Sequence, residues 1–115
     1  MGSESKSAAP TVKRVALGRL DDLKPGHGRV VEVDGRRLAL FRVGDEVLCV
    51  DDRCPHAGGS LAKGSLQGCQ VRCPRHGWRF DLRNGKCLSD PRFVVARIPV
   101  VIKDGDLFLE LAHDE

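Results

Sequence analysis

The chain has 115 residues, of which 41% are hydrophobic, and a formal net charge of +3. This length supports one modest hydrophobic core, so we expect a single domain over residues 11–115. The composition excludes a membrane span, which needs about 20 consecutive apolar residues. It also excludes a typical nucleic-acid partner, because the charge is small, tyrosine is absent and aromatic residues make up 4% of the chain.

The beginning of the chain, residues 1–10, is rich in serine and alanine and has no apolar stretch that could act as a signal peptide. We therefore expect a disordered tail here, and a cytoplasmic location for the protein. A short helical turn is predicted at residues 20–24, immediately before Pro25 and Gly26.

Strand patterns dominate the rest of the chain. Short stretches rich in valine, isoleucine, leucine and phenylalanine alternate with turn residues. Glycine, and aspartate or asparagine next to it, tolerates the positive φ of tight hairpins. The predicted fold is all-β, with stacked antiparallel sheets. The predicted strands are 29–33, 37–43, 46–50, 94–102 and 107–111, and the predicted turns are Asp34-Gly35, Gly44-Asp45, Asn84-Gly85 and Asp104-Gly105.

Two short segments between the strands carry potential metal ligands. Cys54 and His56 are two residues apart, and Cys73 and His76 are three apart. Two thiols and two imidazoles suit either zinc or a [2Fe–2S] cluster. Zinc fingers usually pair their cysteines in one loop and their histidines in another. In this chain each loop has one cysteine and one histidine, which favours the [2Fe–2S] cluster. A second short helical turn is predicted near residues 61–63.

The segments CPHAGG, from Cys54, and CPRHGWRFDL, from Cys73, resemble the two cluster-binding loops of the Rieske family. The resemblance implies Rieske-like stacked sheets with a small cluster-binding subdomain over about residues 51–82. It also implies one [2Fe–2S] cluster, with Cys54 and Cys73 on one iron and His56 and His76 on the other. Ser89-Asp90-Pro91 resembles the proline-containing loop that covers one side of the cluster in this family.

Four positions predict a low reduction potential. High-potential family members have serine and tyrosine hydroxyls shortly after the second histidine ligand, and an extra cysteine in each loop that together form a disulfide. This chain has Trp78 and Phe80 at the hydroxyl positions, and Gly59 and Arg75 at the disulfide positions. We therefore expect a potential near the bottom of the range of roughly −150 to +300 mV for Rieske centres.

Three cysteines remain outside the predicted ligand set. Cys49, in an apolar run, is expected to be a small core residue. Cys69 and Cys87 are expected to be loop thiols without a role; the alternative is a redox-sensing pair near the cluster. An odd number of spare thiols is ordinary in a reducing compartment.

Basic residues are concentrated in residues 72–97, where seven of them face two acidic residues. One interpretation is a docking face for an acidic redox partner. The alternative is that these side chains are simply solvated. The basic residues are Arg72, Arg75, Arg79, Arg83, Lys86, Arg92 and Arg97.

These features predict an electron carrier rather than an enzyme. A Rieske oxygenase also needs a mononuclear iron site, and the remaining histidines, His27 and His113, do not fit one. We expect a soluble Rieske-type ferredoxin, a monomer, that carries one electron at a time from a flavoprotein reductase to a terminal oxygenase of the ring-hydroxylating dioxygenase type. Two alternatives stay open: the Rieske-like small subunit of an assimilatory nitrite reductase, bound to its large subunit, and a zinc-stabilised binding module.

Overall fold

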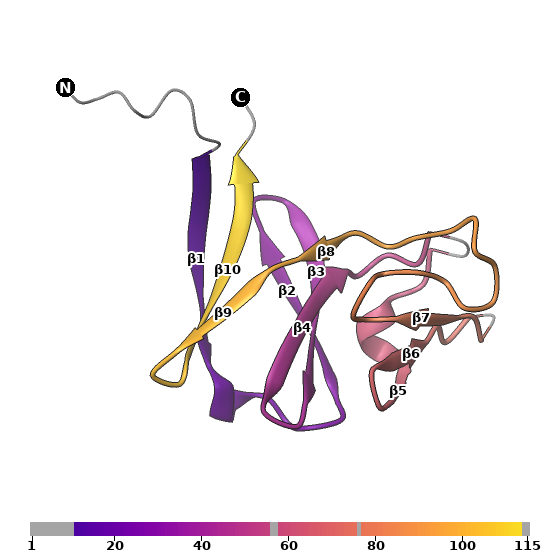
Figure 1. Cartoon of the computed structure of the whole chain (residues 1–115), viewed down its shortest axis with the longest axis horizontal. Helices are drawn as coiled ribbons and strands as arrows, with labels where there is room; N and C mark the ends of the chain where they lie inside the picture. The colour runs from indigo at the N-terminus through magenta and orange to yellow at the C-terminus, as the bar shows by residue number, and fades with distance from the viewer. Residues whose placement is uncertain (1–10, 56–57, 76, 114–115) are drawn as a thin grey trace.

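The computed structural model describes residues 11–55, 58–75 and 77–113, so the predicted tail at residues 1–10 lies outside it. Strands make up most of the described chain and form three antiparallel sheets (Figure 1). Two short 3₁₀ helices, η2 (Leu20–Asp22) and η3 (Leu61–Lys63), lie where the helical turns are predicted. Neither has the length or apolar character of a membrane-spanning helix.

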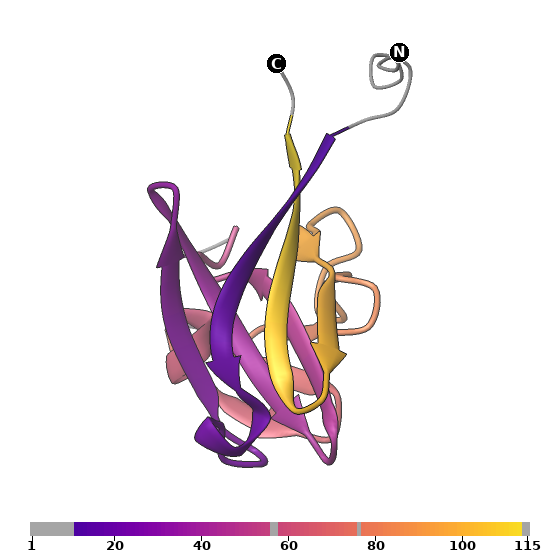
Figure 2. The same ribbon diagram turned by 90° about the vertical axis from the view of Figure 1, so that its left-hand side faces the viewer.

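The first sheet joins the two ends of the described chain. β1 (Thr11–Arg19) pairs antiparallel with β10 (Asp106–His113), and β10 pairs with β9 (Val100–Lys103). The register of β1 shifts at Gly18, which has a φ of 117° in a β-bulge. β1 therefore begins where β10 ends, at one end of the molecule (Figure 2).

The second sheet has the order β2-β3-β4-β8. It consists of β2 (Gly28–Val33), β3 (Arg36–Val43), β4 (Glu46–Asp51) and the short β8 (Arg97–Ile98). Neighbouring strands of this sheet all run antiparallel.

Two aspartate–glycine turns connect strands as the sequence predicts. Asp34 and Gly35, between β2 and β3, have φ values of 52° and 80°. Asp104 and Gly105, between β9 and β10, have the same two values. Two successive positive φ angles define the hairpin turn that suits the natural twist of the strands.

The first two sheets share one hydrophobic core, and we call them together with this core the β base. Its largest fully buried side chains come from β3 and β10, namely Leu38, Leu40, Leu107 and Leu109. Burial of leucine side chains stabilises such a core by roughly 1.5–3 kcal/mol each.

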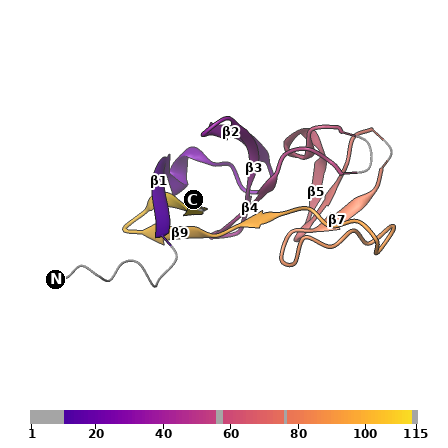
Figure 3. The same ribbon diagram turned by 90° about the horizontal axis from the view of Figure 1, so that it is seen from above.

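A third sheet forms the predicted subdomain, beside the β base (Figure 3). It consists of β5 (Ser65–Gln67), β6 (Gln70–Arg72) and β7 (Arg79–Asp81), preceded by η3. The sequence pattern does not predict these strands individually, since each has three residues.

β3 connects the two parts because both of its faces are buried. Leu38 and Leu40 belong to the core of the β base. Ala39 and Phe41, on the opposite face, belong to a second core that includes residues of the subdomain. Successive side chains of a strand point to opposite faces, so a continuous apolar run can serve two cores at once.

One expectation about the strands is wrong, and one strand is missing from the prediction. Residues 94–102 do not form one strand, because the chain changes sheets at Pro99, between β8 and β9. Proline has no amide hydrogen to donate and commonly interrupts a strand. β1 is absent from the predicted strands; its apolar residues Val15 and Leu17 are half-buried, and its partner β10 is distant in sequence.

Candidate metal centre

The first predicted ligand loop is a closed turn. The backbone N–H of Cys54 donates to the carbonyl of Gly59 at 2.9 Å, and the N–H of Gly58 donates to the carbonyl of Cys54 at 2.8 Å. Gly58 has a φ of 74°, a conformation that favours glycine. These two bonds fix the backbone around the thiol.

The second loop repeats this turn. The N–H of Cys73 donates to the carbonyl of Trp78 at 2.7 Å, and the N–H of Gly77 donates to the carbonyl of Cys73 at 2.9 Å. Gly77 has a φ of 76°. Both turns have the sequence pattern Cys-Pro-x-x-Gly, at residues 54–58 and 73–77. The different Cys-to-His spacings of the two loops hide this repeat.

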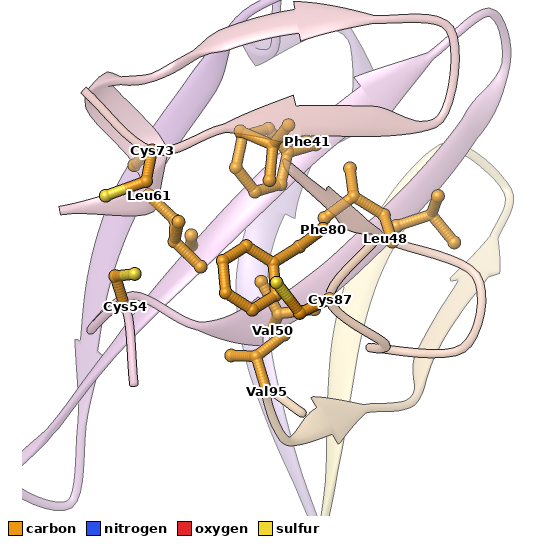
Figure 4. Close-up of a cluster of buried hydrophobic side chains, with 13 residues drawn as sticks. Phe41, Leu48, Val50, Cys54, Leu61, Cys73, Phe80, Cys87 and Val95 are labelled. Carbon is orange, nitrogen blue, oxygen red and sulfur yellow. The ribbon is translucent and has the colours of Figure 1, made fainter. Parts of the chain in front are cut away.

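Both thiols lie in the core that joins the subdomain to the β base. Cys54 and Cys73 are each 1% exposed, and both pack in the same cluster as Leu61 (Figure 4). A Cβ atom built on Gly59 would lie 3.3 Å from the Sγ of Cys73, so the first turn faces the thiol of the second. The other two predicted ligands, His56 and His76, lie outside the described residues.

Asp52 anchors the first turn. It is 2% exposed, and among the described residues no other charged side chain is buried. Its Oδ1 accepts hydrogen bonds from the Ser60 hydroxyl and the Ala62 N–H, both at 2.9 Å. Its carbonyl accepts the N–H of Leu61 at 2.7 Å. Asp52 thus ties the start of the loop to its end. Sequence reasoning missed it, although a carboxylate two residues before a predicted ligand was a usable signal.

The positions that predict a low potential lie around these turns. A Cβ on Gly59 would lie 2.8 Å from the Cγ of Arg75, so the two positions of the family's disulfide are neighbours here. Phe80 is fully buried and has no hydrogen-bond donor to offer a sulfur. Trp78 is half-buried, and its ring packs edge-on against Phe93 with the centroids 5.3 Å apart.

The predicted third loop lies next to the segment that follows the second turn. The N–H of Arg79 donates to the Ser89 hydroxyl at 3.2 Å, and the N–H of Leu88 donates to the Arg79 carbonyl at 2.8 Å. Together with the Trp78–Phe93 contact, these bonds attach residues 88–93 to β7.

The remaining cysteines, Cys49, Cys69 and Cys87, are free thiols in different environments. Cys49 is a core residue of the β base, as predicted, and its burial raises its pKa to about 12. Cys87 lies in a loop outside the named strands, as predicted, but it is 3% exposed, and its Sγ accepts the N–H of Asp90 at 3.3 Å. The apolar side chains of the second core bury it. Cys69 is half-buried in the turn between β5 and β6.

The donor set fits an iron–sulfur cluster. Two buried cysteines in facing turns offer soft sulfur ligands, and each turn contains one histidine in its sequence.

Comparisons with known proteins agree with this chemistry. A family profile described as the Rieske [2Fe-2S] domain matches residues 13–100. The chain is 37% identical over 81 residues to the ferredoxin component of a naphthalene 1,2-dioxygenase system from Pseudomonas putida, which covers 70% of this chain and 78% of that one.

Two solved structures are similar over most of the chain. One is a chain from the complex of reduced oxygenase and oxidized ferredoxin in carbazole 1,9a-dioxygenase, with a TM-score of 0.77, 32% identity, and coverage of 83% of this chain and 99% of that chain. The other, from Mycobacterium tuberculosis, is assigned as an NADH-dependent nitrite reductase small subunit, with a TM-score of 0.84, 28% identity, and coverage of 90% and 99%.

Proposed function

Because this chain belongs to the Rieske [2Fe-2S] domain family, whose members bind one Rieske-type cluster, we propose that Cys54, His56, Cys73 and His76 are its cluster ligands. Cys54 and Cys73 would bind one iron, and the two histidines the other. The observation that carries the proposal is the pair of matching turns, each with a buried thiol at the same position.

The ligand set determines the charge of the site. When bound, a Rieske cluster supplies reversible storage of one electron. The two thiolates neutralise the charge of the oxidised iron–sulfur core, and neutral imidazoles add none. An electron is therefore added to a neutral site rather than to a dianion, which is why histidine ligands raise the potential above that of four-cysteine sites. Phe80 offers no hydroxyl to the sulfurs, which keeps the potential low within the Rieske range.

The protein acts as a one-electron carrier from a flavoprotein reductase to a terminal oxygenase of the ring-hydroxylating dioxygenase type. The naphthalene dioxygenase ferredoxin component and the carbazole dioxygenase complex support this role. In this proposal the oxidation of substrate takes place in the partner enzyme, and the protein works in the cytoplasm, where its three spare thiols stay reduced.

Visible absorption, low-temperature EPR and a redox titration of the purified protein test this proposal. We expect a red-brown protein with the low average g value of a Rieske centre and a potential near the bottom of the range of roughly −150 to +300 mV. A colourless protein with one zinc per chain would overturn the cluster assignment, and a strongly positive potential would overturn the argument from Phe80.

The ligand assignment has its own test in His76→Cys. A third thiolate adds negative charge to the site, so we expect either a lower potential or loss of the cluster. His27→Cys, at an exposed position, is the matched control and should leave the EPR spectrum and the potential unchanged. An unchanged Rieske spectrum in His76→Cys would remove this residue from the ligand set.

A second candidate function is the small subunit of an assimilatory nitrite reductase. The TM-score of 0.84 with the M. tuberculosis chain supports it. The two functions differ in how the protein associates with its partner. Affinity purification from its native cell would recover a carrier free of stoichiometric partners, whereas a small subunit would co-purify with a large sirohaem-containing subunit.

A further inference from the structure

The basic side chains around the two ligand turns have no ion-pair partner among the described residues. Among the described residues, none of the basic side chains between residues 53 and 80 forms an ion pair, whereas eight ion pairs occur elsewhere. Residues 53–80 contain five basic residues and no aspartate or glutamate, which gives this segment a charge of +5. The rest of the chain, with 14 basic and 16 acidic residues, carries −2. We call the five residues the basic collar: Arg53, Lys63, Arg72, Arg75 and Arg79.

The basic collar, within residues 53–80, differs in its bounds from the basic stretch expected at residues 72–97. Arg83 pairs with Glu46 at 2.9 Å, and this hydrogen bond raises the pKa of Arg83. Arg92 pairs with Asp90 at 2.6 Å. Arg97 donates to the carbonyl of Leu82 at 3.0 Å. Arg83, Arg92 and Arg97 are thus engaged within the protein, whereas Lys86 is exposed and forms no ion pair in the described part of the chain. The basic residues next to the ligand turns are also without ion pairs there.

Three collar arginines lie directly against the two turns. A Cβ on Gly77 would lie 3.0 Å from the Nε of Arg72, and a Cβ on Gly58 would lie 3.8 Å from the Nε of Arg53. The aliphatic part of Arg75 covers Gly59 in the same way. The absence of side chains at these glycines lets the arginines approach the backbone of the turns.

Grooves connect the collar residues beside the second turn. Lys63, Arg72 and Arg75 line a groove of about 450 Å³ together with Cys73. Arg72 also lines a smaller groove of about 70 Å³ with Arg79, its Cα partner across β6 and β7. Arg72 therefore links both grooves into one basic surface next to a proposed ligand.

We propose that the basic collar is the docking surface for an acidic face of the redox partner protein. The inference rests on the proposed electron-carrier function and names the kind of partner. Unpaired arginines in a shallow groove match carboxylates on a protein surface, to which they can form two parallel hydrogen bonds. The difference in charge between residues 53–80 (+5) and the rest of the chain (−2) orients the protein as it approaches an acidic partner. Such electrostatic steering increases association rates by roughly 10–10³-fold. The electron then crosses at the turns that the collar surrounds.

Charge reversal at matched sites tests the collar. The collar variant is Lys63→Glu/Arg72→Glu/Arg79→Glu. The control is Lys24→Glu/Arg29→Glu/Lys103→Glu, at three exposed positions of the β base that, in the described part of the chain, form no ion pair. Both change the net charge equally. The neutral variant Lys63→Gln/Arg72→Gln/Arg79→Gln serves if the collar reversal does not fold.

The first readout is the rate at which anionic hexacyanoferrate(III) oxidises the reduced protein, which passes one electron to the iron of the probe. At an ionic strength of about 0.1 M, where charges act over roughly 10 Å, we expect the collar variant to react at least about tenfold more slowly and the control within about threefold of the wild type. Cationic hexaammineruthenium(III) should show the opposite change. Equal rates in the collar variant and the control would overturn the proposal.

The second readout is calorimetric titration with poly-L-glutamate, as a mimic of an acidic protein surface, and with single-stranded DNA of equal charge. We expect poly-L-glutamate to bind the wild type and the control, and the collar variant at least about tenfold more weakly. Binding of DNA more than tenfold tighter than of poly-L-glutamate would replace the protein partner with a nucleic acid. If the purified protein lacked the Rieske EPR signal, the carrier function itself would be refuted. If the signal were intact but the collar variant and the control gave the same rates and affinities, only the docking role of the collar would be refuted.

Discussion

Asp52 combines burial with several hydrogen bonds, so its removal should be costly. In Asp52→Ala, the Ser60 hydroxyl and the Ala62 N–H lose their acceptor. A buried donor left unsatisfied costs roughly 1–3 kcal/mol, and we expect the free energy of unfolding to fall by about that amount. Asp52→Asn keeps the acceptor oxygen and should lose less. Denaturant unfolding followed by circular dichroism measures both.

Asp45 offers the matched control for this comparison. Its side chain is 95% exposed and lies 3.4 Å from Arg42. Exposed ion pairs contribute about 0–1 kcal/mol, so Asp45→Ala should cost much less than Asp52→Ala. Equal losses in the two variants would show that the hydrogen bonds of Asp52 do not stabilise the loop.

The buried thiol of Cys49 should make the free energy of unfolding depend on pH in the alkaline range. Its folded pKa is raised from 9.0 to about 12 by burial. Between these values the unfolded chain releases the thiol proton and the folded protein retains it, so stability is complete below pH 9 and declines as pH rises towards 12. The slope of one proton is about 1.4 kcal/mol per pH unit. In Cys49→Ala this part of the slope should disappear from unfolding free energies measured at pH 9–11; an unchanged slope would contradict the assignment to Cys49.

Single residues were predictable from the sequence where their type and spacing carry the chemistry. The spacing of Cys54 and Cys73 predicts them as ligands, which stays a prediction, and the apolar run around Cys49 correctly predicted a core residue. The burial of Cys87 was not predictable, because both of its neighbours in sequence, Lys86 and Leu88, are exposed and its burial comes from Phe80 and Val95, which only the fold brings to it. For the same reason the sequence could not separate engaged from unengaged arginines.

Among the elements, β2 and η3 approach each other closely at Gly28. A Cβ on Gly28 would lie 2.6 Å from the carbonyl oxygen of Ala62 and 2.7 Å from Cε1 of Phe41. Gly28→Ala should therefore push η3 away from β2 and destabilise the protein by roughly 1–3 kcal/mol. Because η3 follows the first turn, amide hydrogen exchange at residues 58–64 should become faster.

Gly68 provides the control, since nothing lies within 4 Å of a Cβ built there. Gly68→Ala introduces strain only through its φ of 60°, at a cost of about 1–2 kcal/mol. Exchange at residues 58–64 should be unchanged in this variant. Faster exchange there in both variants would mean that general destabilisation, and not the contact with η3, controls the first turn.

The elements differed in how well they could be predicted. The hairpins closed by Asp34-Gly35 and Asp104-Gly105 follow from local chemistry, and the sequence predicts both. The strands of the third sheet and the division at Pro99 depend on contacts between sheets. β1 depends on a partner at the other end of the chain, so no local pattern marks it.

At the scale of the whole molecule, the described residues form two hydrophobic cores, and both proposed cysteine ligands belong to the second. In Cys54→Ser/Cys73→Ser, which removes both thiolates, we expect the cluster to be absent and the subdomain to lose hydrogen-exchange protection in β6 and β7. β10 should stay protected, because its core is separate. Loss of protection in all strands together would show that the two cores unfold as one unit.

The pairing of Thr11 with His113 places the two ends of the described chain side by side on β1 and β10, in the sheet that contributes no residue to the second core (Figure 1). A polypeptide attached at either end would leave the molecule there without crossing the ligand turns. The fold is therefore suited to covalent tethering: fused to an enzyme through a linker, it could deliver electrons at a high effective concentration while its donor and acceptor surface stayed accessible.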